Sequence, residues 1–112
     1  MKKSQRARLE KAGWKFGGSA EFLGLSKEEV AFVELKLGLA GSLRAHRVRR
    51  RMTQAELARA LHSSQSRIAK MESGDPSVSI DLLVRSLLSL GVSRRDIGRI
   101  IAASRLKARR VD

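Results

Sequence analysis

A short polar stretch, QSRIAKMES at residues 65–73, carries side chains suited to recognition by hydrogen bonding. Gln, Ser, Arg and Lys supply both donors and acceptors, and they occur here as Gln65, Ser66, Arg67 and Lys70. Ile68 and Met71 are apolar and lie three residues apart, which is the spacing of one helix face. The stretch therefore predicts a short helix that buries its apolar side and displays hydrogen-bonding groups.

Bond-breaking chemistry is not indicated by the sequence. Ser, His, Asp and Glu are present, but no Gly-rich phosphate loop, paired carboxylates or nucleophile motif brings them together, so we expect no enzyme and no cofactor. The chain has no cysteine, and His46 and His62 are its two histidines. We therefore expect no metal site, and we interpret His62 as a turn residue rather than a ligand or a pH switch.

The charge of the chain points to an anionic partner. There are 24 Lys and Arg against 11 Asp and Glu, a formal net charge of +13 in 112 residues, and nucleic acid is the first candidate. A basic RNA-binding or ribosome-associated protein is an alternative, opposed by an aromatic content of 4% and the lack of tyrosine. No apolar run could span a bilayer, so we expect a cytoplasmic protein that binds no membrane.

Capping residues mark the starts of five helices, and no stretch alternates with a period of two, so the predicted fold class is all-α. The five starts are Ser26, Thr53, Ser64, Ser79 and Ser93. Glu29 and Glu56 complete capping boxes with the first two. Gly74 and Gly91 should end the third and fourth helices. The first helix is either one long helix or two helices joined near Gly41.

Two short helices with a tight polar turn, the second displaying hydrogen-bonding side chains, suit the DNA major groove, which admits one α-helix. The segment MTQAELARALHSSQSRIAKMESG resembles the helix-turn-helix of the Xre family, of the Cro and C1 repressor type. The likeness extends from about Leu43 through SIDLLVRSLLSLGV to Val92. It implies a five-helix domain that binds double-stranded DNA and regulates transcription, probing the major groove with helix 64–73.

The rest of the chain flanks this domain. We place the helix-turn-helix domain at residues 26–104, after a basic and irregular extension at 1–25 and before a basic tail at 105–112. Four large apolar residues of the extension either pack on the domain or bind a partner. They are Trp14, Phe16, Phe22 and Leu23.

The resemblance also implies which residues contact DNA. Gln65 and Ser66 would meet base edges, while Arg67 and Lys70 would reach bases or flanking phosphates. Gln54 would clamp a phosphate and brace its neighbour.

Two further pairs follow from the same resemblance. Ser64 and Ser73 would lie near the DNA backbone, where the N–H groups at a helix N-terminus also favour phosphate. Arg47 and Glu72 occupy the positions of an internal ion pair that ties the first helix of the domain to the helix in the groove. Their expected role is structural.

Three residues depart from the family pattern. His62 stands in the turn where the family usually has Gly, and it can adopt the left-handed conformation at some energetic cost. Ser63 replaces the usual apolar turn residue, and Arg51 stands where Gly often precedes the motif. These changes concern the turns, not the fold.

The segment 13–47 resembles the leader of HigA-like antitoxins, which bind a RelE-like toxin and repress their own operon. Such an antitoxin is the alternative to a repressor without a toxin. The strong positive charge argues against it, because an antitoxin usually offers an acidic surface to a basic toxin.

A homodimer is expected, because one such module contacts only half of a two-fold operator. The candidate dimer surface is an apolar stripe near the C-terminus, formed by Val92, Ile97, Ile100 and Ile101. The same stripe could instead close the core of each monomer.

Overall fold

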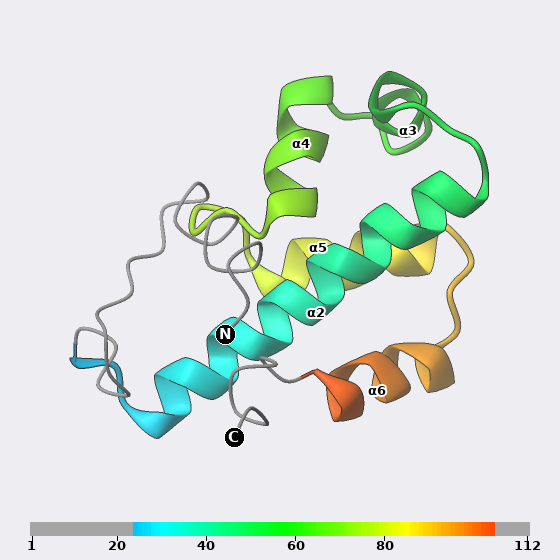
Figure 1. The fold of residues 1–112 in the computed structure, drawn as a ribbon. Coiled ribbons are helices and arrows are strands. Elements are labelled where there is room, and N and C mark those ends of the chain that lie inside the picture. The colour runs from blue at the N-terminus through cyan, green and yellow to red at the C-terminus, as the bar shows by residue number, and fades with distance from the viewer. Residues whose placement is uncertain (1–23, 105–112) are drawn as a thin grey trace.

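The computed structural model describes residues 24–104, and this part of the chain folds into five α-helices without a strand (Figure 1). The helices are α2 (Lys27–Arg49), α3 (Gln54–Ala60), α4 (Gln65–Ser73), α5 (Ile80–Ser89) and α6 (Arg94–Ala103). The all-α prediction is confirmed. The tail at 105–112 and residues 1–23, with the four large apolar residues of the extension, lie outside the described residues.

Helix α2 is one long helix and is not interrupted at Gly41. Its predicted capping box is confirmed, since the Ser26 hydroxyl accepts the Glu29 N–H at 3.1 Å and the Glu29 carboxylate accepts the Ser26 N–H at 2.7 Å. Helices α4, α5 and α6 all pack on α2, which makes it the central element of the domain (Figure 1).

The remaining helices begin and end where local chemistry predicts. The Thr53 hydroxyl accepts the Glu56 N–H at 3.0 Å, and the hydroxyls of the other three predicted caps accept the N–H three residues on. Gly74 and Gly91 follow α4 and α5 with φ of 70° and 89°, the left-handed conformation that ends a helix. His62 follows α3 with φ of 56°, as predicted for this turn.

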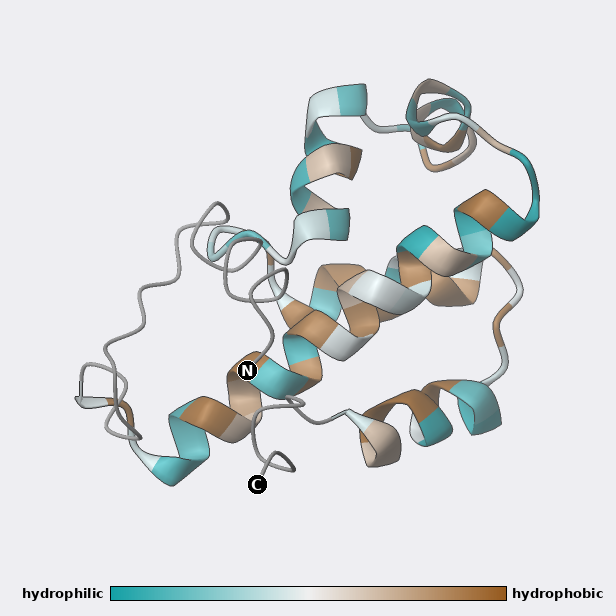
Figure 2. Ribbon diagram, in the orientation of Figure 1, coloured by the Kyte–Doolittle hydropathy of each residue, from teal (hydrophilic) through white to brown (hydrophobic). Residues whose placement is uncertain are grey.

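The core lies between α2 and the helices around it (Figure 2). Its most buried large side chains are Leu39, Leu43, Leu57, Ile68, Met71, Leu83 and Leu87. On α2, Leu39 is fully buried, whereas Val30 and Leu37 are only partly buried. Helix α2 has neighbours on more than one side, so its buried arc is wider than a single helical stripe.

The apolar stripe proposed for dimerisation is largely part of the monomer. Val92 and Ile97 are 5% and 7% exposed and belong to the core cluster, and Ile100 packs against that cluster. Helix α6 contacts α2 and α5, which is why these side chains are covered within one chain. The expectation that Val92 and Ile97 form a dimer surface is therefore wrong. Ile101, at 39%, is exposed.

Candidate DNA-binding surface

Helix α4 has one fixed face and one exposed face. Ile68, Met71 and Glu72 are buried against the domain. Gln65, Ser66, Arg67 and Lys70 of the same helix are all exposed. Since the side chains of the buried face are packed, the positions of the exposed groups are set by the core rather than by a mobile loop.

A hydrogen-bonded ion pair ties α4 to the end of α2. The Arg47 guanidinium donates to both oxygens of Glu72, with Nε to Oε2 at 2.5 Å and Nη2 to Oε1 at 3.0 Å. The same guanidinium also donates a hydrogen bond from Nη1 to the Met52 carbonyl oxygen, at 2.8 Å. The side chains of the pair are 13% and 3% exposed. This bidentate pairing fixes both the distance and the relative orientation of the guanidinium and the carboxylate. The hydrogen bond to Glu72 also raises the pKa of Arg47.

Gln54 at the start of α3 joins the same network. Its amide Nε2 donates to Glu72 Oε1 at 3.1 Å, so the tie links α2, α3 and α4. A phosphate oxygen can only accept hydrogen bonds, as Glu72 does. The second N–H of the Gln54 amide is therefore the group available to clamp a phosphate while the first one holds the network.

The serines of α4 differ in what they can still donate. The Ser64 hydroxyl accepts the Arg67 N–H at 3.2 Å and lies 3.3 Å from the Ser66 hydroxyl. Either hydroxyl of this pair can be the donor, so the other one keeps a proton to donate. The Ser73 hydroxyl instead donates to the Lys70 carbonyl oxygen at 3.0 Å. Ser73 can donate to a phosphate only after its hydroxyl rotates away from that carbonyl.

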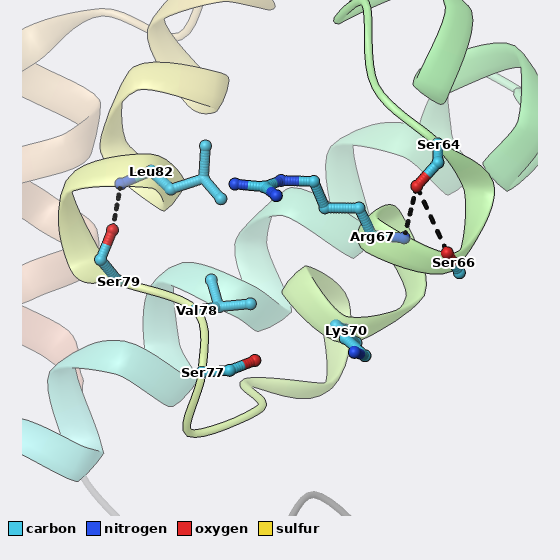
Figure 3. A pocket seen from close by; sticks show the side chains of 8 residues that line it. All are labelled: Ser64, Ser66, Arg67, Lys70, Ser77, Val78, Ser79 and Leu82. Atoms are coloured by element: carbon cyan, nitrogen blue, oxygen red, sulfur yellow. Dashed lines mark hydrogen bonds between the residues drawn. The ribbon is translucent and has the colours of Figure 1, made fainter.

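A hollow of about 410 Å³ separates α4 from the start of α5. Figure 3 shows the Arg67 side chain extending across it toward Leu82, with the serine hydroxyls of both walls nearby. Its lining residues are Ser64, Ser66, Arg67, Lys70, Ser77, Val78, Ser79 and Leu82. The hollow thus combines two cations with several hydroxyls, a lining that suits an anionic group.

Two of these lining residues, Ser77 and Ser79, were not among the predicted contacts. Ser79 was recognised only as the cap of α5, and its hydroxyl accepts the Leu82 N–H at 3.0 Å, while its own proton has no acceptor among residues 24–104. The sequence signal for a site here is the N-terminus of α5, because helix N-termini attract anions. What the sequence does not give is that this N-terminus lies beside α4.

The loop that carries Ser77 is held by polar contacts. The Asp75 carboxylate accepts from the Ser77 N–H at 2.8 Å and from its hydroxyl at 2.6 Å, which lowers the pKa of Asp75. Lys36 Nζ donates to the Pro76 carbonyl oxygen at 3.1 Å. Burial lowers the pKa of Lys36, against the opposing effect of the Asp75 charge. The loop is therefore tied both to itself and to α2.

Within residues 24–104, no three or more His, Cys, Asp or Glu residues are grouped so that they could hold a metal ion. None of the helices between these residues is long and apolar enough to cross a membrane.

Comparison with known proteins identifies the domain. A family model described as helix-turn-helix matches residues 43–97, from the last turns of α2 into the first turn of α6. No curated protein and no solved structure matches the chain. The match begins near the end of the segment 13–47, so it does not support the likeness to antitoxin leaders. Residues 43–97 therefore form a helix-turn-helix domain of the Cro/C1 type, the Xre family, and such a domain supports a DNA-binding transcription regulator.

Proposed function

We propose that this protein is a sequence-specific repressor that inserts α4 into the major groove of double-stranded DNA. The observation that carries the proposal is the contrast between the two sides of α4. Its exposed side presents Gln65, Ser66, Arg67 and Lys70, and its inner side is fixed by core packing and by Glu72. A rigid helix with a row of donors and acceptors is what readout of base edges requires.

The contacts divide into two classes. Gln65 and Ser66 lie at the N-terminal end of α4, the end that meets base edges in this docking mode, and a Gln amide can pair with adenine through two hydrogen bonds. Lys70 and the hollow-lining Arg67 hold the flanking phosphates, together with Gln54 and Ser64.

The assembly we propose is a homodimer on a two-fold operator, in the cytoplasm and associated with the nucleoid when bound to DNA. One α4 covers only half of such a site, so a symmetric pair gains both affinity and specificity. The antitoxin function with a RelE-like toxin depended on the leader, and none of the observations on residues 24–104 favours it.

The test separates base contacts from phosphate contacts. A duplex is first selected from random sequences with the wild-type protein, and its binding and that of scrambled DNA are measured at several salt concentrations. Gln65→Ala should lose about 1 to 3 kcal/mol on the selected duplex alone, with its salt dependence unchanged. Lys70→Ala should weaken both duplexes alike and lower the log–log salt slope by about one unit.

Arg99→Ala is the charge-matched control. Arg99 lies on α6, on the other side of α2 from α4, and it is 68% exposed in a surface pair with Asp96 (Figure 1). This control should bind both duplexes as the wild type does. If Gln65→Ala kept the wild-type ratio between selected and scrambled duplexes, α4 would not be the helix that reads the sequence.

A further inference from the structure

The corner between α2 and α3 places an arginine in a backbone conformation that favours glycine. Arg51 has φ of 58°. Its N–H donates to the Val48 carbonyl oxygen at 2.9 Å, and the Met52 N–H donates to the Arg47 carbonyl oxygen at 3.1 Å. These two bonds form the helix-ending turn in which glycine is usual, because a Cβ disfavours the left-handed conformation. Strain of this kind tends to be kept where a side chain has a function.

The same corner carries positive charge that no acidic group of the described chain neutralises. Arg49, Arg50 and Arg51 are all exposed, and none of the three takes part in an ion pair within residues 24–104. Burial, with the charges of Arg49 and Arg50, lowers the pKa of the neighbouring His46. Arg47 is different, because it turns inward to Glu72.

The corner is fixed relative to α4. Arg47 donates to the Met52 carbonyl oxygen and to Glu72 of α4, and Gln54, three residues after Arg51, donates to the same carboxylate. When the second helix of such a motif lies in the major groove, the first helix crosses the DNA backbone. Residues directly before α3 then lie beside the phosphates that border the groove.

We propose that Arg50 and Arg51 bind the phosphate backbone next to the groove occupied by α4. Arg51 then takes the place of a glycine because its guanidinium contributes to this contact. Arginine suits the role, since its planar guanidinium pairs with phosphate oxygens through two parallel hydrogen bonds. The proposal rests on the proposed function and adds a phosphate contact from the turn before α3 to the contacts proposed for Gln54 and α4.

The decisive variant is Arg51→Gly, because stability and DNA affinity should change in opposite directions. Glycine relieves the left-handed strain, so the Tm should rise by roughly 2 to 5 °C. The lost phosphate contact should lower the log–log salt slope by about one unit and weaken selected and scrambled duplexes alike. Arg51→Lys should keep the wild-type slope, and Arg50→Ala should lower it as Arg51→Gly does.

Arg99→Ala again serves as the control for the loss of one positive charge far from α3. An unchanged slope in Arg51→Gly, or an equal loss in Arg99→Ala, would overturn the proposal. So would a complete lack of DNA binding by the wild type. A different outcome separates the two proposals. If the wild type bound selected and scrambled DNA equally but Arg51→Gly still lowered the salt slope, the proposed sequence-specific function would be wrong and the proposed phosphate contact of Arg51 would be supported.

Discussion

Four helices of the domain end in the same kind of turn, in which one residue has a positive φ. In two of these turns that residue carries a Cβ, Arg51 after α2 and His62 after α3, and in the other two it is glycine, Gly74 after α4 and Gly91 after α5. Their φ angles lie between 56° and 89°. In each turn the next residue donates its N–H to the carbonyl oxygen five positions back. These bonds are Met52 to Arg47, Ser63 to Ala58, Asp75 to Lys70 and Val92 to Leu87.

The difference between these corners follows from what surrounds them. A Cβ on Gly74 would come within 2.7 Å of the Leu37 side chain, so this corner is restricted by packing as well as by φ. Gly91 has no atom within 4 Å of such a Cβ, and Arg51 and His62 are exposed. A buried corner requires glycine, whereas an exposed corner tolerates another residue at the cost of backbone strain. At exposed corners the side chain is therefore free to serve a function.

Removing the ion pair that holds the Arg51 corner should have the largest effect. Glu72→Ala leaves the mostly buried Arg47 guanidinium without its carboxylate and takes the acceptor from Gln54. We expect a loss of about 3 to 5 kcal/mol in the free energy of unfolding, measured with urea. Asp81→Ala, which breaks an exposed pair with Arg85, is the control and should cost less than about 1 kcal/mol. Equal small losses would mean that the tie contributes no more than a surface pair.

Substitution by alanine should lower the free energy of unfolding more at Gly74 than at Gly91. Gly74→Ala adds a clash with Leu37 to the strain of a positive φ and should cost about 2 to 3 kcal/mol in urea unfolding. Gly91→Ala adds only the strain and should cost about 1 kcal/mol. Similar losses in the two variants would show that Leu37 moves away freely and that burial does not distinguish the corners.

His62→Gly should stabilise the protein by up to about 1 kcal/mol, because it removes the same strain as Arg51→Gly. Unlike that variant, it should leave the salt slope of DNA binding unchanged. Urea unfolding and duplex binding at several salt concentrations measure the two effects. A loss of slope in His62→Gly would mean that both exposed corners contact DNA, and the contrast between them would disappear.

The smallest effect is expected beside the His62 corner. The Ser63 hydroxyl is buried and finds no hydrogen-bond partner within the described residues. Ser63→Ala should therefore raise the free energy of unfolding by about 0.5 kcal/mol. Ser64→Ala is the matched control, since it removes the cap of α4 and should lower that free energy by about 1 kcal/mol. Changes of the same sign in the two variants would contradict this assignment.

Helix starts and ends were predictable because they depend on contacts between residues close in sequence. Each cap is a serine or threonine hydroxyl bonded to an N–H three positions on, and Gly74 and Gly91 adopt a conformation open to glycine wherever it occurs. The two faces of α4 follow from the spacing of Ile68 and Met71 alone. Local hydrogen bonding and helical period therefore determined the elements and the exposed row of the candidate site.

Other features were decided by tertiary structure. Helical period marked the stripe of α6 as apolar, but only packing on α2 and α5 decided that Val92 and Ile97 are covered within one chain. Ser77 and Ser79 join the site because the chain folds back to lay the start of α5 beside α4. The left-handed conformation of Arg51 was not predicted, since the local preference of a residue with a Cβ opposes it. Contacts between distant segments outweigh such preferences only when the whole domain packs, and these contacts are not encoded in the spacing of neighbouring residues.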